Sequence, residues 1–551
     1  MEQILASDIE LVSRLSTTGV YDYVVVGSGI GGGILTEELV KKKKTVLLLE
    51  RGGITFSTHV CNTARPDFRR GKADSPEGNE LVYGALKAPV QTAQGSEPYI
   101  GGPMYCLGGR SNVWGLWTPA VDDATLKEYF PREICDDLLP QGHEDARNLL
   151  SNYSQIHSIY PAEDFKTENG VNALDNATDA LNDAVGNYLQ PGHKLGLGTL
   201  AVQLKAPQPY RFPQGGFSTT GPLLNRMYAK DKHLTVALHT EVLEVEYSEP
   251  GSGAKASSHV TNLFVRSTTN QQIYKIAADR STVILSAGTL ATAKIALTSG
   301  LQRLNPLVGK GLIDHEAWAM RCAQERPDNV SPQSREPMLL QSMINIAGRR
   351  CLMSVTYNSN FFLGGSSRLS IRQYWDKEGR RRMPIKAGKD LIKDKDTDFD
   401  TVAVFLEFHA ELDEENEVVN LPSPDPIIRI KRPDPQVDER FQLELQELCT
   451  KIRDSTLDLK TELPDLEPAP RPSLLGIGVY SHEVGTMRMD GPKGKGVVDH
   501  NLKVHGFDNL FCCDLSVYPV SPPANPSRTL TAISLRLAKH LVSKADENSR
   551  E

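Results

Sequence analysis

The sequence lacks the features that mark several large protein classes. Its 551 residues contain no uninterrupted apolar run of membrane-spanning length, and no basic stretch followed by an apolar core near residue 1. The eight cysteines show no CxxC spacing, which predicts neither a zinc site nor a disulfide framework. A formal net charge of -8 argues against a nucleic-acid-binding surface. These absences together predict a cytoplasmic protein that binds neither membranes nor nucleic acids.

The first motif that is present is a glycine-rich turn between a strand and a helix. Residues 21–26 form a short β-branched run typical of a buried parallel strand, and residues 34–41 are helix-like. Between them, Gly27 permits a tight turn, Gly29 lets the backbone approach a diphosphate, and Gly32 allows close packing of helix against strand. The helix N-terminus then offers unpaired N–H groups to the phosphates.

A second strand completes this dinucleotide-binding pattern. Residues 45–49 are apolar and end in Glu50, which is placed to accept hydrogen bonds from ribose hydroxyls. A carboxylate at this position repels a 2′-phosphate, so NADP is disfavoured and FAD and NAD remain. The order of strand, glycine turn, helix, strand and acid makes a ligand-free turn the weaker interpretation.

Later segments resemble the glucose–methanol–choline (GMC) oxidoreductase family, and this resemblance favours FAD. In that family the second glycine signature lies along the flavin, two middle segments return to the cofactor domain, and the C-terminal module holds the catalytic residues. The matching stretches here are 107–115, 241–245, 283–289, 308–315, 481–489, 497–499, 502–506, 509–516 and 525–529. They cover the cofactor half of the chain, whereas residues 150–230 and 318–475 match only in general layout.

The resemblance implies a set of FAD-binding residues. These are Gly27, Gly29, Ile30, Gly32, Glu50, Arg51, Gly108, Gly109, Asn112, Val113, Val242, Ala287, Gly288, Asp514, Pro526 and Thr529. In pyranose-oxidase-like relatives the second loop offers a histidine that bonds covalently to the flavin. Val113 stands at the matching place and has no nucleophile, so the FAD is expected to be non-covalent.

Oxidation of an alcohol needs a hydride acceptor, a base for the hydroxyl proton and a stabiliser for the reduced flavin. Flavin N5 supplies the first. His482 is the candidate base because imidazole titrates near neutrality. The resemblance to the family's His/Asn type implies that Asn525 hydrogen-bonds the substrate oxygen, and the N-terminus of the helix after Pro526 would favour the anionic reduced flavin. Asn525 is also a good N-cap residue, and capping alone is the alternative.

Other histidines are interpreted as structural. His315 is explained by packing and hydrogen bonding near the cofactor domain, and His500 and His505 by turns or solvation. No group of histidines and acids has metal-ligand spacing, so no metal is predicted.

The expected fold class is α/β, with a Rossmann-like FAD-binding domain and an interleaved α+β substrate domain built on an antiparallel sheet. The FAD-binding domain is predicted to collect residues 1–150, 231–317 and 476–551, and the substrate-binding domain residues 151–230 and 318–475. Within the latter, 369–372 and 402–409 are strand-like and 441–457 is an amphipathic helix. Phe405, Glu407 and His409 share one strand face, which points either to the substrate cavity or to solvent.

The predicted function is FAD-dependent oxidation of a small-molecule alcohol. One alternative keeps FAD as a structural fixture for a lyase, cyclase or dehydratase reaction in secondary-metabolite biosynthesis, because His482 serves either chemistry. A non-catalytic FAD-binding protein and an NAD-dependent dehydrogenase are further alternatives. The sequence leaves open the substrate, the electron acceptor and the oligomeric state.

Overall fold

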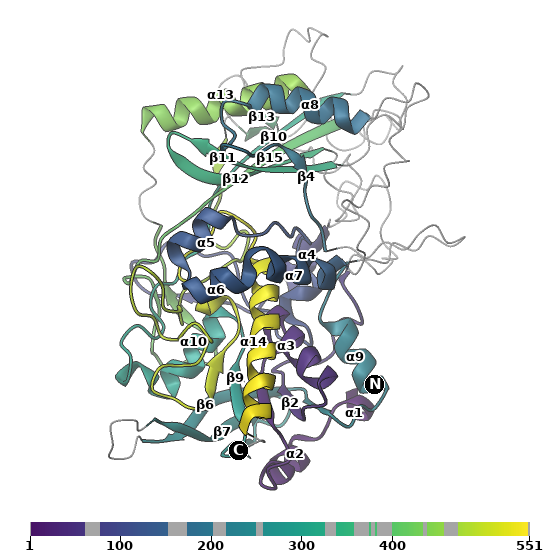
Figure 1. Ribbon diagram of the computed structural model, residues 1–551, viewed down its shortest axis with the longest axis vertical. Coiled ribbons are helices and arrows are strands. Elements are labelled where there is room, and N and C mark those ends of the chain that lie inside the picture. Colours follow the sequence, from purple (N-terminus) through teal and green to yellow (C-terminus); the bar gives the residue numbers. More distant parts are fainter. Residues whose placement is uncertain are drawn as a thin grey trace, which may run out of the picture.

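The structure is a computed structural model with two halves, one around a parallel sheet and one around an antiparallel sheet (Figure 1). It describes residues 2–60, 78–151, 173–201, 216–249, 257–325, 338–357, 374–375, 381–382, 399–432, 438–456 and 472–548. The predicted strand at 369–372 lies outside the described residues.

The parallel sheet has five strands in the order β19-β9-β1-β2-β5. Apolar and β-branched side chains fill it because both of its faces are covered, and all residues of β1 and β2 are buried. Neighbouring strands pair in parallel throughout. The strands are β1 (Tyr23–Val26), β2 (Val46–Leu49), β5 (Leu234–Ala237), β9 (Thr282–Leu285) and β19 (Leu510–Cys512).

Two helices from opposite ends of the chain lie side by side against this sheet. Helix α3 (Ile30–Lys41) follows β1 and contacts α14 (Ser527–Asn548), the yellow helix of Figure 1. Their approach to the strands requires small residues, since a Cβ built on Gly31 would lie 1.9 Å from the carbonyl oxygen of Cys513. Helices α9 (Thr220–Tyr228) and α10 (Thr289–Thr298) also belong to this half, and α9 contacts α3.

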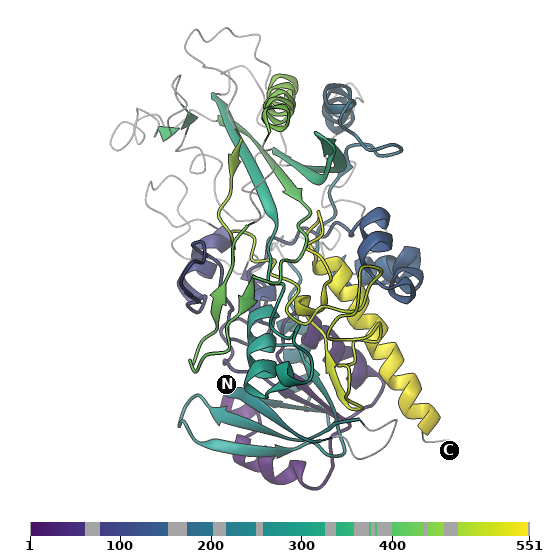
Figure 2. The ribbon, with the colours of Figure 1, turned by 90° about the vertical axis from the view of Figure 1, so that its left-hand side faces the viewer.

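A small antiparallel sheet extends the lower half (Figure 2). It consists of β6 (Thr240–Ser248), β7 (His259–Ser267) and β8 (Ile273–Ala277). Helix α2 (Ile9–Ser16) packs on β8, and Asp8 caps it by accepting hydrogen bonds from the N–H groups of Glu10 and Leu11.

The upper half is a six-stranded sheet in the order β18-β10-β15-β12-β11-β4. Helices α8 (Ala173–Val185) and α13 (Glu439–Thr456) contact each other and cover its outer face (Figure 1). The strands are β4 (Gly196–Leu197), β10 (Glu316–Glu325), β11 (Met338–Ile346), β12 (Arg349–Tyr357), β15 (Phe399–Phe408) and β18 (Ser473–Leu474). The predicted strand at 402–409 and helix at 441–457 are thereby confirmed.

Shorter elements complete the described part of the chain. The helical ones are α1 (Glu2–Leu5), α4 (Gly78–Leu86), η2 (Gly109–Asn112), α5 (Asp123–Tyr129), α6 (Arg132–Asp137), η3 (Leu138–Gly142), α7 (His143–Ser151), η5 (Leu301–Arg303) and η8 (Leu515–Val517). The strands are β3 (Gln91–Thr92), β13 (Tyr374–Trp375), β14 (Arg381–Arg382), β16 (Glu417–Val418) and β17 (Ile427–Arg429). In the described part of the chain, no helix combines the length and apolarity that a membrane crossing needs. The mixed α/β class is confirmed, and the division of the chain into two interleaved domains stays a prediction.

Candidate active site

The glycine turn after β1 is shaped by close contacts on one side and open space on the other. Gly27 has φ of 97°, a left-handed conformation that favours glycine. A Cβ on Gly32 would lie 2.1 Å from the carbonyl oxygen of Gly27, which fits the predicted helix–strand packing. By contrast, a Cβ on Gly29 would meet no described atom within 4 Å. The open side of the turn therefore lies at Gly29, at the N-terminus of α3 beside Ile30, where a diphosphate fits.

Glu50 at the end of β2 is buried and bonded to the turn. One carboxylate oxygen accepts from the Ser28 hydroxyl at 2.5 Å and the Ser28 N–H at 3.2 Å, and the other from the Gly52 N–H at 3.0 Å. Burial raises the pKa of Glu50. In this structure the acid thus fixes the turn, and a ribose hydroxyl would share oxygens that already accept from protein donors.

The second glycine loop lies directly over the first. The Gly108 N–H donates to the Ser28 hydroxyl at 2.8 Å, and a Cβ on Gly109 would come 3.6 Å from the Gly29 Cα. Asn112 is fully buried; its amide donates to the Leu107 carbonyl and its oxygen accepts from the Thr220 hydroxyl. The two loops, about 80 residues apart in the chain, therefore form one cradle.

The remaining predicted cofactor residues are distributed around this cradle. Arg51 stacks on Tyr105, with its guanidinium carbon 3.8 Å from the ring centroid, and pairs with Asp425 at 3.1 Å. Val113 and Val242 are buried, and Val242 lies on β6. The Ala287 N–H donates to the Thr292 hydroxyl at 3.0 Å.

Asp514 and Gly288 contact each other at the carboxyl ends of β19 and β9. Asp514 accepts from the Gly288 N–H at 2.9 Å, the Thr292 hydroxyl at 2.6 Å and the Ser516 N–H at 2.9 Å. Burial raises its pKa. Asp514 therefore holds the N-terminus of α10 in place, rather than presenting an unbonded carboxylate.

The start of α14 does not use Asn525 as its cap. The first helical hydrogen bond runs from the Leu530 N–H to the Pro526 carbonyl at 2.9 Å, and the helix begins at Ser527. Thr529 is buried, and its hydroxyl oxygen lies 3.1 Å from His143 Nε2. The capping alternative for Asn525 is therefore not what the structure shows.

Asn525 instead contacts a buried acid from the antiparallel sheet. Its amide nitrogen donates to Glu407 Oε1 at 3.3 Å, and Glu407 on β15 is completely buried. Among the described residues, neither Glu407 Oε2 nor Asn525 Oδ1 has a hydrogen-bond partner. Two polar atoms thus lie buried and unsatisfied at the junction of the two sheets, which is how a site for a polar ligand appears without it.

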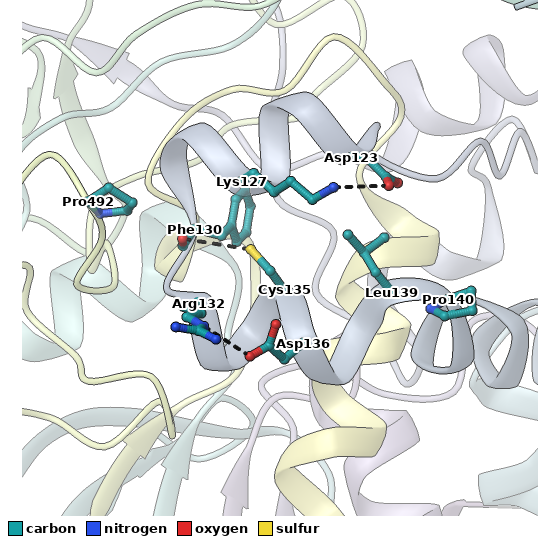
Figure 3. Close-up of a pocket in the computed structure, with 9 residues that line it drawn as sticks. All are labelled: Asp123, Lys127, Phe130, Arg132, Cys135, Asp136, Leu139, Pro140 and Pro492. Atoms are coloured by element: carbon teal, nitrogen blue, oxygen red, sulfur yellow. Dashed lines mark hydrogen bonds and ion pairs between the residues drawn. The ribbon is translucent and has the colours of Figure 1, made fainter. Parts of the chain in front are cut away.

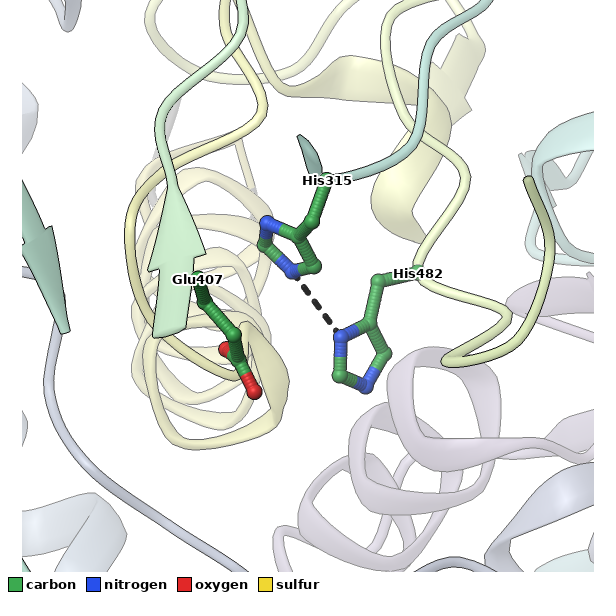
Figure 4. Close-up of side chains that lie close together, drawn as sticks. All are labelled: His315, Glu407 and His482. Carbon is green, nitrogen blue, oxygen red and sulfur yellow. Dashed lines mark hydrogen bonds between the residues drawn. The ribbon is translucent and has the colours of Figure 1, made fainter. Parts of the chain in front are cut away.

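His482 lies beside this pair and is bonded to His315. The Nε2 atom of His315 is 2.9 Å from Nδ1 of His482, and the rings meet edge to face with centroids 5.0 Å apart (Figure 4). Tyr480 stacks on His482 at 5.8 Å between centroids. Ligating atoms of His315, Glu407 and His482 all lie within 4.8 Å of one another. Such a set is able to hold a metal, although the two imidazoles already direct facing nitrogens at each other.

Burial sets the protonation of this cluster. It lowers the pKa of His482 well below the usual value, with the neighbouring His315 and Arg110 adding to the effect, and it lowers the pKa of His315 to about 3. It raises the pKa of Glu407 to about 8, assisted by repulsion from Asp314. At pH 7 the cluster therefore contains two neutral imidazoles and a neutral carboxylic acid.

An ion pair between the partly exposed Arg110 and the buried Glu483 joins the second glycine loop to the His482 segment. Arg110 Nη1 donates to Glu483 Oε2 at 2.8 Å and to the Ser481 carbonyl at 2.6 Å, so it grips both neighbours of His482. Tyr99 also donates to Glu483. Arg110 thus couples the position of His482 to the loop that is predicted to lie along the flavin.

A separate surface pocket lies on α5, α6 and η3, with a volume of about 740 Å³ (Figure 3). Its charged side chains form exposed ion pairs one helical turn apart, Lys127 with Asp123 and Arg132 with Asp136. Cys135 donates to the backbone carbonyl of Leu126. None of the predicted site residues lines it, so it contributes nothing to the function proposed below.

Sequence reasoning missed two members of the cluster. The sequence explains His315 by packing and hydrogen bonding near the cofactor domain; the structure shows the hydrogen bond, and its partner is His482, which the sequence does not predict. Glu407 was recognised as sharing a strand face with Phe405, but the direction of that face was left open; in the structure Glu407 points inward to Asn525. The available signal is one acid, Glu407, within the otherwise apolar run 402–408.

Comparison with known proteins identifies the C-terminal module. Residues 460–534 match a family model described as GMC oxidoreductase. Pyranose 2-oxidase of Tricholoma matsutake is 34% identical over 76 residues, which are 14% of each chain. Dehydrogenase str4 of Strobilurus tenacellus is 37% identical over 57 residues, 10% of this chain and 9% of the relative. These alignments therefore span only a small part of either relative.

Solved structures match over nearly the whole chain. Pyridoxine 4-oxidase from Mesorbium loti has a TM-score of 0.58 at 16% identity, covering 94% of this chain and 99% of its own. A formate oxidase of Aspergillus oryzae, studied for its FAD modification, has a TM-score of 0.58 at 15% identity, covering 96% and 99%. These neighbours and the family match support FAD as the cofactor, as predicted. Residues 460–534 thus match the GMC oxidoreductase family model, and the chain has a fold similar to that of the solved oxidases.

Proposed function

We propose that this chain is an FAD-dependent oxidoreductase that oxidises the CH–OH group of a small-molecule alcohol, with His482 as the base. The observation that carries the proposal is the meeting of His482, Asn525 and Glu407 where the parallel and antiparallel sheets join. A carbinol placed there would meet a neutral imidazole and buried hydrogen-bonding atoms that lack partners in the described structure.

The cofactor would be held by the cradle of the two glycine loops. Gly29 leaves space for the diphosphate at the N-terminus of α3, and Gly108 and Gly109 close over it. FAD supplies the hydride acceptor when bound. Val113 has no nucleophilic side chain, which supports non-covalent attachment.

The chain's own residues would handle the proton and the orientation of the substrate. Neutral His482 accepts the hydroxyl proton on its ring nitrogen. Asn525 and the protonated Glu407 orient the substrate oxygen by hydrogen bonds, because each has a polar atom left unpaired by the described residues. Burial between the two sheets excludes water and strengthens these interactions.

The test is anaerobic mixing of the yellow protein with a panel of alcohols, primary and secondary, small and bulky. Bleaching of the flavin band identifies an oxidised substrate. His482→Ala should lower the rate of bleaching by about 10²- to 10⁴-fold, the range for loss of a general base, with unchanged flavin content. Unchanged bleaching in His482→Ala would refute the assignment of the base.

One observation favours a second candidate, a lyase, cyclase or dehydratase that keeps FAD as a structural fixture. A neutral acid, Glu407, lies within reach of a neutral base, His482, and such a pair serves acid–base chemistry without net oxidation. The same anaerobic experiment separates the two candidates: product formed without bleaching supports the non-redox reaction.

A further inference from the structure

Ser521 and His315 form a hydrogen-bonded chain behind the proposed base, His482. The Ser521 hydroxyl lies 3.1 Å from Nδ1 of His315, and Nε2 of His315 lies 2.9 Å from Nδ1 of His482. Ser521 and His315 are buried, and Ser521 is held by paired backbone hydrogen bonds with Ala410 at 3.0 Å. The chain therefore consists of groups with little freedom to move.

The direction of this chain depends on which nitrogen of His315 carries the hydrogen. Burial keeps both imidazoles neutral, so each ring has one N–H and one lone pair. The Ser521 hydroxyl is able to accept the hydrogen of His315 Nδ1 or to donate to its lone pair. Because Nδ1 of His482 faces His315, a base on His482 has to act through Nε2, and this requires that Ser521 accepts from His315 Nδ1.

If His315 Nδ1 carries the hydrogen, His315 Nε2 has the lone pair. His482 Nδ1 must then be the donor across the 2.9 Å contact. The one N–H of His482 then donates in that hydrogen bond. The lone pair is on Nε2, which points away from His315 (Figure 4). Within the described part of the chain, no side chain or backbone group hydrogen-bonds to that Nε2.

We propose that His315 is a positioning residue that fixes the tautomer of His482, so that Nε2 of His482 always presents its lone pair to the substrate. This inference rests on the proposed function of His482 as the base. An uncharged imidazole would thus fix the tautomer of the base here, as a carboxylate does for the histidine of a hydrolase triad.

The variants that test this are His315→Gln and His315→Leu. The amide oxygen of Gln reaches roughly where His315 Nε2 lies and still accepts from His482, whereas Leu has a similar size and no acceptor. His315→Leu is expected to lower kcat by about 10- to 100-fold with little change in KM, because a tautomer change removes the base and not the binding site. His315→Gln should retain activity within about fivefold of the parent. Flavin content and Tm, measured for both, identify any variant that fails to fold.

A direct readout of the tautomer is independent of turnover. Two-bond ¹H–¹⁵N spectra of holoprotein labelled with ¹⁵N-histidine distinguish the two tautomers, and the spectrum of His482→Gln assigns the signal. The expected result is a protonated Nδ1 and an unprotonated Nε2 on His482 in the parent and in His315→Gln, with loss of that single state in His315→Leu.

Two results would overturn the inference. The first is a parent His482 protonated at Nε2, which would mean that Ser521 donates to His315 and the chain runs the other way. The second is equal kcat for His315→Leu and His315→Gln. If instead no alcohol bleaches the flavin, the proposed function fails while the tautomer measurement still decides the role of His315.

Discussion

At the scale of single residues, the unusual group is Glu407. Its carboxyl is completely buried and, among the residues that the structure describes, is hydrogen-bonded only to the Asn525 amide, so burial keeps it neutral and raises its pKa to about 8. Its surroundings include Asp314, His315, His482 and the Cys351 thiol, none of which is a cation at pH 7. Glu407 therefore offers the substrate a hydrogen-bond donor at neutral pH and loses it in alkali.

Glu407→Gln keeps a neutral donor of the same shape. We expect activity of the parent to fall as pH rises through about 8, where the acid ionises, and activity of Glu407→Gln to lack that decline. The comparison requires kcat/KM at several pH values for both proteins. A parallel alkaline decline in both would assign it to another group.

The ionisation of Glu407 should also make the stability of the fold depend on pH, in a direction that its raised pKa defines. The pKa of Glu407 in the fold, about 8, lies above its ordinary value of about 4.5. The group therefore makes a contribution to the free energy of unfolding that is complete below about pH 4.5 and is lost as the pH rises through about 8. The Tm of the parent should therefore fall relative to the Tm of Glu407→Gln as the pH rises from 5 to 9. A Tm difference that is constant with pH would show that Glu407 is ionised in the fold.

At the scale of elements, two glycines at the N-terminus of α3 have different roles, one in packing and one in the proposed binding of the cofactor. Gly31 touches the Cys513 carbonyl so closely that an added Cβ would lie 1.9 Å away, whereas Gly29 has open space and an ordinary φ of -61°. Gly31 therefore permits the close packing of the helix, and Gly29 leaves room for the ligand.

Substitution by alanine should distinguish these roles. Gly29→Ala is expected to leave the Tm of the FAD-free protein within a few degrees of the parent and to weaken FAD binding by at least tenfold, because the methyl group occupies the space left for the diphosphate. Gly31→Ala should lower the Tm of the FAD-free protein, since overpacking costs about 1–3 kcal/mol. Fluorescence titration with FAD and thermal unfolding provide the two readouts, and equal effects of the two variants would contradict the distinction.

Regular elements were accessible from the sequence where they have a strong local pattern. The β-branched run before Gly27, the acid after β2 and the amphipathic helix α13 all depend on neighbours in the chain. The Glu407–Asn525 and His315–His482 contacts do not, because they join residues 118 and 167 positions apart. Local periodicity contains no information on such pairs, and only family resemblance selected Asn525 and His482.

At the scale of the whole molecule, the cradle of the two glycine loops, which we propose as the cofactor site, is built from distant parts of the chain. The turn after β1, the loop at Gly108 and the C-terminal segment before α14 meet in one half, while the antiparallel sheet covers the site from the other. Ligand that binds only this assembled state stabilises the fold by mass action.

Removal of FAD should therefore lower the free energy of unfolding, and adding it back should restore the loss in a concentration-dependent way. The expected gain is about 2.7 kcal/mol at a free FAD concentration of 100 Kd. The measurement is the Tm of deflavinated protein over a series of FAD concentrations, with riboflavin as the control that lacks the diphosphate. A Tm that is independent of FAD would argue against the cradle as the binding site.

The strand that carries Glu407 has a consequence for how ligands are selected. In the register of the sheet Glu407 lies opposite Ala317 on β10 and Leu352 on β12, so a ladder of backbone hydrogen bonds holds its strand along both sides. An acid on a surface loop can shift to suit each ligand, whereas the backbone of Glu407 is held in place by two neighbouring strands. A substrate must therefore place its own polar atom at the fixed position of this carboxyl group. A change in substrate range would come from substitutions of the neighbouring side chains, with Glu407 kept.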